Sequence, residues 1–315
     1  MDYSIFYRRS INTERISEEL PRFDLLISAY NPTERIQKAF SEVRAKRKVW
    51  LIHPEYQFTG IDLPQNQECI QPEGIDEVAQ IDSILQKIDD IRGISVCVDI
   101  TGFMRHVLAF FVAKLQNLGV KKVEFLYSEP MFYKKQEETI FSTTTSGTVR
   151  PVRGMAGSKN SNGLDFLILG VGYDHRLISE VTNNKDSSTV HPVFGFPSLS
   201  PDMYQQSAIR SAESGEVALE NSWLTNRHFA PANDPFSTAQ VVSEIVDEIE
   251  VNDHLSNIYL SPLSTKVQAL GFALYWCLEG KSRGAVSFLM PECLTYSRET
   301  SEGLKRLWSY TVEFI

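Results

Sequence analysis

The first half of the chain alternates short apolar runs, rich in β-branched and aromatic residues, with longer segments of helical periodicity. Such alternation predicts βαβ units built on a mostly parallel sheet. The predicted strands are residues 23–30, 48–54, 94–100 and 122–128, and the predicted helices are residues 33–45, 74–91 and 102–118. We therefore expect an α/β fold in which helices flank the sheet.

The second half repeats this order of elements. An apolar run at residues 164–171 precedes a helical pattern from His175, and further apolar runs follow at residues 191–197, 257–263 and 285–290. Helical patterns at residues 237–250 and 266–278 separate the later runs, and an insertion at residues 198–227 contains a helical stretch and Trp223. The tail from residue 303 is expected to form a helix and a closing strand.

The two halves also match residue by residue. FDLLISAYNPTERIQKAF aligns with LDFLILGVGYDHRLISEV, which pairs Asp24 with Asp165 and Arg35 with Arg176. SVCVDITGFMRHVLAFF aligns with NIYLSPLSTKVQALGFA, and VEFLYSEPMFY aligns with VSFLMPECLTY with one gap. We interpret these matches as an internal duplication; the alternative is coincidence between ordinary βαβ patterns. The prediction is two tandem Rossmann-like units related by a pseudo-two-fold axis: residues 1–150, a linker at 151–163 and residues 164–315.

The net charge of the chain limits the classes of molecule that it is expected to bind. A formal charge of -9 argues against non-specific binding of duplex DNA, which needs a basic face, but allows a small anionic ligand held by a few cations and backbone amides. The N-terminus lacks a signal-peptide pattern, and the longest apolar run is too short to span a membrane. The four cysteines are widely spaced, as expected of free thiols. We therefore expect a cytoplasmic protein without membrane contact.

Polar residues gather where the predicted strands end, which is where ligands bind to parallel sheets. Glycines there allow close backbone approach, hydroxyls and cations at helix starts suit phosphate groups, and carboxylates suit ribose hydroxyls. The candidate ligand-binding residues of the first half are Asn31, Thr33, Arg35, Asp99, Thr101, Gly102, Arg105 and Glu129. Those of the second half are Gly170, Gly172, Asp174, Arg176, Ser264, Thr265, Lys266 and Glu292.

Each candidate also has a purely structural interpretation. Asp, Ser and Thr at helix starts commonly cap the helix, and carboxylates at strand ends are commonly surface residues. The six histidines show no paired metal-ligand spacing, so no metal site is expected. No cofactor can be assigned from the sequence. An acid–base role in an enzyme is a further interpretation of Asp99, Asp174, His175 and Glu129.

The segment DITGFMR resembles the CARF family, Rossmann-like domains that sense cyclic oligonucleotides in CRISPR-linked defence. In that family a strand ends in Asp, Ile or Leu, Ser or Thr, and Gly, and a cation enters the next helix; Arg105 stands at the cationic position. LSTK in the second half is similar to the family's Gly-Thr-Lys pattern. The related SAVED domains resemble two such units fused in one chain. The resemblance implies a ligand-binding cleft between the halves, a role in antiviral defence and an effector in a separate protein.

Three functional hypotheses follow. The first is a sensor module for a nucleotide-like or phosphorylated small ligand. The second is an enzyme that cleaves or transfers a phosphorylated nucleotide or sugar at the same residues. The third is a non-catalytic assembly subunit. Loss of turnover without loss of binding in Asp174→Ala or Glu129→Ala would favour the enzyme.

Overall fold

The computed structural model describes residues 1–88, 90–133, 142–200, 203–213, 223, 225–252, 256–298 and 301–314. The chain forms two compact units. What we call the first unit comprises Phe6–Thr144 and Cys293–Ile315, and the second unit comprises Met1–Ile5 and Thr145–Glu292. These units differ from the predicted boundaries at residues 150 and 164, because the two chain ends each join the unit formed by the opposite half.

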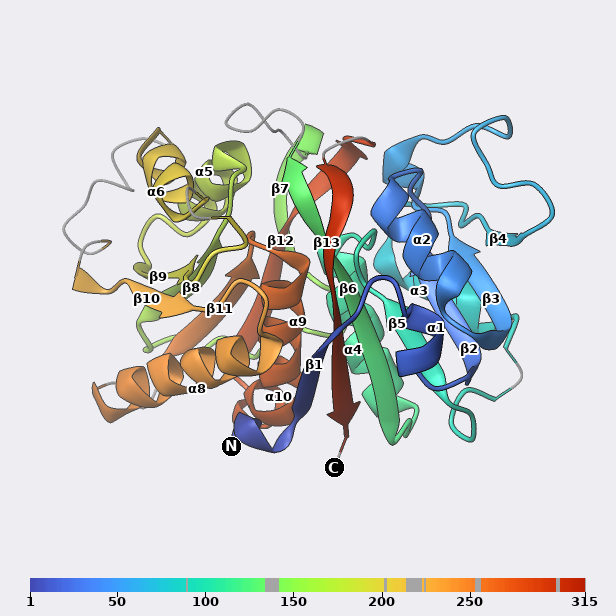
Figure 1. Cartoon of the computed structure of the whole chain (residues 1–315). Coiled ribbons are helices and arrows are strands. Elements are labelled where there is room, and N and C mark those ends of the chain that lie inside the picture. The colour runs from blue at the N-terminus through green and yellow to red at the C-terminus, as the bar shows by residue number, and fades with distance from the viewer. Residues whose placement is uncertain are drawn as a thin grey trace. The chain divides into compact units, whose positions relative to one another are not determined.

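The first unit is built on a seven-stranded sheet with the order β1-β13-β6-β5-β2-β3-β4 (Figure 1). Strands β2 to β6 are parallel to their neighbours, whereas β13 runs antiparallel to both β6 and β1. The strands are β1 (Tyr7–Ile11), β2 (Phe23–Ala29), β3 (Ala45–Leu51), β4 (Glu68–Ile70), β5 (Val96–Asp99), β6 (Lys122–Tyr133) and β13 (Ser301–Glu313). The expected parallel sheet is therefore present and gains an antiparallel edge.

Helices of the first unit follow the expected order. They are α1 (Ile16–Glu19), α2 (Glu34–Glu42), a 3-10 turn η2 (Pro54–Tyr56), α3 (Glu77–Leu85) and α4 (Arg105–Asn117). Helix α2 buries Ile36, Ala39 and Phe40, whose spacing places them on one face of a helix. That face joins a core in which the Phe40 ring stacks on Trp50, with the ring centroids 3.6 Å apart. Burial of this apolar stripe explains why the segment is helical.

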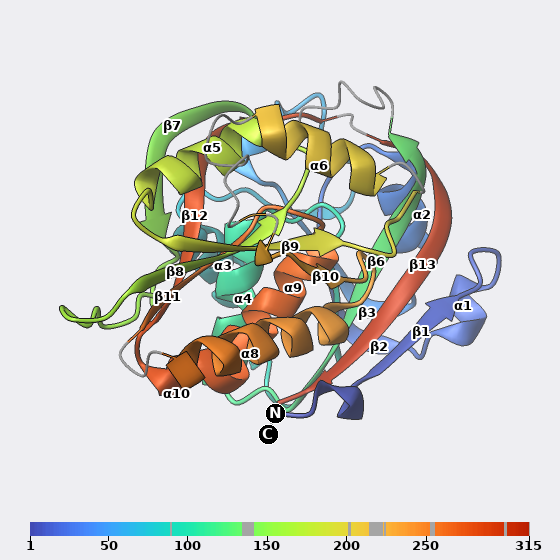
Figure 2. The same ribbon diagram turned by 90° about the vertical axis from the view of Figure 1, so that its left-hand side faces the viewer.

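The second unit contains a six-stranded sheet with the order β10-β9-β8-β11-β12-β7. Its strands are β7 (Ser142–Pro151), β8 (Asp165–Val171), β9 (Thr189–Gly195), β10 (His228–Ala230), β11 (Asn257–Pro262) and β12 (Val286–Tyr296). Its helices are α5 (His175–Asn184), α6 (Met203–Glu213), α8 (Pro235–Asn252), α9 (Lys266–Tyr275) and α10 (Lys281–Arg283), with the π-helical turn η5 (Trp276–Gly280) and the 3-10 turn η1 (Tyr3–Ile5). Figure 2 shows α5 and α6 on one face of the sheet and α8 and α9 on the other. The predicted α/β fold with two mostly parallel sheets flanked by helices is confirmed.

Strand registers agree with the alignment of the two halves. In the first unit Leu25 pairs with Val96, and in the second unit the aligned Phe166 pairs with Ile258. The aligned aspartates also make equivalent contacts. Asp24 links the start of β2 to the start of β5, and Asp165 links the start of β8 to the start of β11. Asp24 accepts a hydrogen bond from the Ser95 amide at 2.8 Å, and Asp165 accepts one from the Asn257 side chain at 2.8 Å. These matches support the internal repeat, whereas a two-fold relation between the units stays a prediction.

One predicted element is wrong. Residues 303–313 were expected to begin with a helix, but they lie in β13, which pairs along the length of β6. The predicted linker is held against β12: the Val152 amide donates to Phe288 O, and the Phe288 amide donates to Met155 O, both at 2.9 Å. Val152 and Met155 are each 1% exposed. Partners distant in sequence, which local patterning does not reveal, determine both outcomes.

Candidate functional site

The carboxyl ends of β2 and β5, next to the middle of β6, bring several predicted residues together in the first unit. Arg35, the second residue of α2, is 8% exposed, and its guanidinium donates a hydrogen bond to the Ser128 carbonyl in β6. Its Nε forms no hydrogen bond with any described residue, and no described carboxylate lies within ion-pair distance of the guanidinium. A buried cation without a paired carboxylate retains capacity for an anion.

Asp99 and Thr101 form a buried link between β5 and its neighbours. Asp99 accepts hydrogen bonds from Ser28 Oγ at 3.1 Å and from Thr101 Oγ1 at 2.5 Å. The Thr101 hydroxyl in turn accepts the Ser128 amide at 2.9 Å. Burial raises the pKa of Asp99, while the hydrogen bonds from Thr101 and Ser28 and the charge of Arg35 act against this rise. These two predicted ligand-binding residues are therefore used to join strands.

Tyr56 is bonded to the loop before α4 and is affected by the charges of both Arg35 and Arg105. Its hydroxyl donates a hydrogen bond to the Gly102 carbonyl at 3.1 Å, and its ring lies edge-on to Tyr296, with the centroids 5.7 Å apart. Burial raises the pKa of Tyr56, and the charges of Arg35 and Arg105 both act in the opposite direction. We call Arg35, Tyr56, Gly102 and Arg105 the arginine site.

Gly102 has a clear steric requirement. A Cβ atom on Gly102 would lie 2.4 Å from the Ala29 carbonyl oxygen at the end of β2. The predicted close backbone approach is therefore present, but the group that approaches belongs to the chain itself. This packing places the loop before α4 against the end of β2.

Asn31, Thr33 and Glu129 have different surroundings. Asn31 accepts a hydrogen bond from the Thr33 amide at 3.1 Å and donates one to the Arg298 carbonyl at 2.8 Å. Thr33 precedes α2, and its buried Oγ1 forms no hydrogen bond with the described part of the chain. Glu129 is 1% exposed, pairs with Lys305 at 3.1 Å and accepts from Trp308 Nε1 at 3.0 Å. Glu129 thus links β6 to β13. Its binding of ribose hydroxyls stays a prediction.

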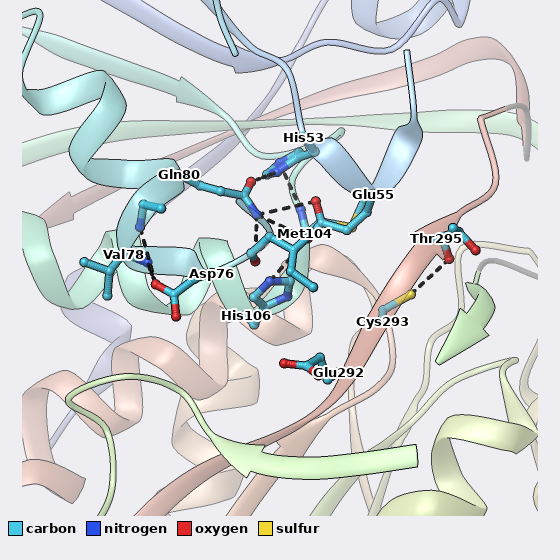
Figure 3. Close-up of polar contacts among 12 residues, drawn as sticks. His53, Glu55, Asp76, Val78, Gln80, Met104, His106, Glu292, Cys293 and Thr295 are labelled. Atoms are coloured by element: carbon cyan, nitrogen blue, oxygen red, sulfur yellow. Dashed lines mark hydrogen bonds and ion pairs between the residues drawn. The ribbon is translucent and has the colours of Figure 1, made fainter. Parts of the chain in front are cut away.

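A network of buried polar side chains lies beside the start of α4 (Figure 3). The Met104 amide donates to His53 Nε2 at 3.2 Å, and His53 Nδ1 lies 2.5 Å from Gln80 Oε1. Gln80 Nε2 donates to Glu55 at 3.2 Å, and His106 Nε2 lies 3.4 Å from the same carboxylate. We call His53, Glu55, Gln80 and His106 the histidine network. The sequence placed His53 at a strand end but showed none of its partners.

In the second unit, the two glycines of the first strand loop contact the loop before α9. A Cβ on Gly170 would lie 3.1 Å from Ser264 Oγ, and one on Gly172 would lie 2.2 Å from Leu263 O. Asp174 caps α5 by accepting the Leu177 amide at 3.5 Å. These three residues are thus occupied in packing and capping. Arg176 is exposed, unlike the aligned Arg35.

The start of α9 is held by an ordinary cap. Thr265 Oγ1 accepts the Gln268 amide at 3.1 Å and donates to the Ala232 carbonyl at 2.8 Å. Ser264 and Lys266, on either side of Thr265, are 5% and 9% exposed. Glu292 forms an ion pair with Arg150 at 3.3 Å. The structure therefore gathers Gly170, Gly172 and Ser264, whereas Glu292 lies in an ion pair of its own.

Sequence reasoning missed Tyr56 and the histidine network. Tyr56 follows the strand predicted at residues 48–54, so the rule that ligands bind beyond strand ends could have included it. Glu55 follows the same strand, but Gln80 carries no such signal, because its contact with Glu55 exists only in the folded chain. Only the folded chain brings these groups together.

Comparison with protein-family models, with curated proteins and with solved structures finds no match for this chain. Across the described residues, no group of three or more His, Cys, Asp or Glu side chains is arranged to hold a metal ion. Every described helix is too short or too polar to cross a bilayer. Function is therefore inferred from the chain's own residues.

Proposed function

We propose that this chain is a binding module for a phosphorylated, nucleotide-like small ligand and that the arginine site receives an anionic group of that ligand. The observation that carries the proposal is Arg35, a cation 8% exposed with no described carboxylate partner and with an Nε free of hydrogen bonds to described residues. The charge of Arg35 already acts on Asp99, but its Nε keeps a donor that an anionic group can use.

The surroundings of Arg35 fit this role. Arg105 supplies a second cation from the first residue of α4, and the N-terminal amides of a helix attract anions. The parallel strands β2 and β5 end here beside β6, and this edge is where ligands bind to open α/β sheets.

Binding is favoured over acid–base catalysis by the surroundings of the carboxylates. Asp99 accepts hydrogen bonds from Ser28 and Thr101, Asp174 caps α5, and Glu129 pairs with Lys305. Each carboxylate that was considered as a catalytic group is thus occupied by the chain itself. The CARF-like segment around Arg105 extends the proposal to a sensor of cyclic oligonucleotides in antiviral defence, acting on an effector in a separate protein.

Thermal unfolding with a panel of ligands tests the proposal. The panel contains mononucleotides, cyclic oligonucleotides, NAD and sugar phosphates. A ligand at a hundred times its Kd adds about 2.7 kcal/mol to the free energy of unfolding and raises the melting temperature. We expect at least one phosphorylated compound to do so, and we expect Arg105→Ala to reduce the effect. A panel without any shift would contradict the proposal and favour an assembly subunit.

A further inference from the structure

We propose that the histidine network positions Arg105, and that its four side chains thereby set the affinity of the arginine site for an anion. The inference rests on the proposed function and names residues that act on the same site without touching the ligand. His53, Glu55 and Gln80 are each 0% exposed, and the side chain of His106 is 12% exposed. The network is therefore largely shielded from solvent. It can affect the arginine site only by holding the residues on either side of Arg105.

The backbone at the start of α4 depends on His53. Helix α4 begins at Arg105, and Met104, the residue before it, provides no side-chain cap. The first amides of a helix have no partner within the helix, so each needs one from elsewhere. The Met104 amide finds it in His53 Nε2 at 3.2 Å. His53 thus fixes the backbone immediately before Arg105.

The direction of each hydrogen bond in the network follows from this contact. An amide only donates, so Nε2 of His53 is the acceptor and Nδ1 of a neutral His53 carries the proton. Nδ1 then donates to Gln80 Oε1, which directs the Gln80 amino group toward Glu55 and toward the Ile75 carbonyl at 3.0 Å. His53 is therefore set in one tautomer by a side chain from α3.

Glu55 holds the other side of Arg105. Burial alone would raise the pKa of Glu55, but the hydrogen bond from His106 leads the contacts that outweigh it and lower the pKa, which keeps the group a carboxylate. This carboxylate lies 3.4 Å from Nε2 of His106, the second residue of α4. In the chain, Arg105 therefore lies between Met104, whose amide is bound by His53, and His106, whose side chain is bound by Glu55.

The second unit shows that starting this helix does not require such a network. The corresponding helix α9 is capped by Thr265 alone, whose hydroxyl accepts the Gln268 amide. Helix α9 also begins with a cation, Lys266, which is 9% exposed. One hydroxyl thus suffices to start that helix, whereas four polar side chains gather at the start of α4.

A double-mutant cycle between His53 and Arg105 tests the proposal, with inorganic phosphate as the probe. Binding is followed by amide chemical shifts of the full chain, below the melting temperature of every variant. We expect His53→Ala to weaken phosphate binding about tenfold, the loss typical when outer-shell support of a bound ion is removed. We expect no further loss from His53→Ala in the Arg105→Ala background. His53→Gln, which offers another acceptor to the Met104 amide, should recover most of the affinity.

Three results would each overturn the inference, and they can be told apart. A purely structural role would lower the melting temperature of His53→Ala and leave the phosphate affinity of the folded chain unchanged, which would overturn the proposal. An equal loss of affinity with and without Arg105 would overturn it as well. Absence of phosphate binding by the unmodified chain would overturn the proposed function together with this inference. If His53→Ala does not fold, His106→Ala provides the same cycle from the more exposed end of the network.

Discussion

At the scale of single residues, the structure shows which candidates the fold itself uses to join its elements. Arg35 and Arg105 lie near a shared tyrosine, whereas Asp99 and Thr101 join strands. The sequence identified all four by their place after a strand, but position alone does not show which hydrogen bonds a side chain already makes. Hydroxyl and carboxylate groups find partners within the chain easily, and a buried guanidinium has more donors than the Ser128 carbonyl can satisfy.

Gly102 provides a prediction at this scale. Gly102→Ala would place a methyl group 2.4 Å from the Ala29 carbonyl, so the loop before α4 must shift. We expect a loss of about 1–3 kcal/mol in the free energy of unfolding, the usual cost of overpacking. Gly60→Ala is the matched control, because nothing lies within 4 Å of the added atom. Urea unfolding measures both, and equal stability of the two variants would show that the loop is loosely packed.

His191 provides a prediction for pH. Burial lowers the pKa of His191 to about 4, and the neighbouring His228, 3.2 Å away, acts in the same direction. The unfolded chain therefore binds a proton below about pH 6.5 while the folded chain does not, so stability falls as the pH drops from about 6.5 toward 4. The contribution reaches about 3 kcal/mol at most. His191→Gln should flatten this part of the stability curve, and an unchanged curve would contradict the assignment.

At the scale of elements, the sequence predicted the central strands and their flanking helices well. Strand β2 and helix α5 begin at the residues expected, because apolar periodicity and a capping residue mark them locally. Strands β7 and β13 were not predicted as they stand. Both gain their stability from pairing with strands distant in the chain, and neither composition nor periodicity shows such pairing. The Ser- and Thr-rich sequence of β7 is equally typical of a linker.

At the scale of the whole molecule, the chain ends contribute to the units formed by the opposite halves. Leu307, Tyr310 and Val312 of β13 are all 0% exposed in the first unit, and Tyr3 is 1% exposed in the second. The sequence correctly indicated two α/β units but assigned β13 to the second. The residues of β13 carry no pattern that shows which unit the strand joins.

Because β13 belongs to the first unit, we can predict how fragments of the chain fold. A fragment of residues 1–150 contains the predicted first unit but lacks β13, so β6 would lose its antiparallel neighbour and the core would lose three buried side chains. We expect it to unfold without a cooperative transition, by circular dichroism. Residues 6–144 joined to residues 293–314 through a flexible linker should fold cooperatively. Cooperative unfolding of the shorter fragment would contradict the role given to β13.

The central claim is that the arginine site binds the anionic group of a nucleotide-like ligand. The most direct measurement is a calorimetric titration of the best compound from the thermal-shift panel into the unmodified chain, Arg105→Ala and Arg92→Ala. Arg92 is the matched control, because it is an exposed arginine of the first unit paired with Asp90 at 2.9 Å. We predict that Arg105→Ala weakens binding by about 1.5–3 kcal/mol, the range for a charged hydrogen bond, while Arg92→Ala binds like the unmodified chain. Equal affinity of all three proteins would contradict the account.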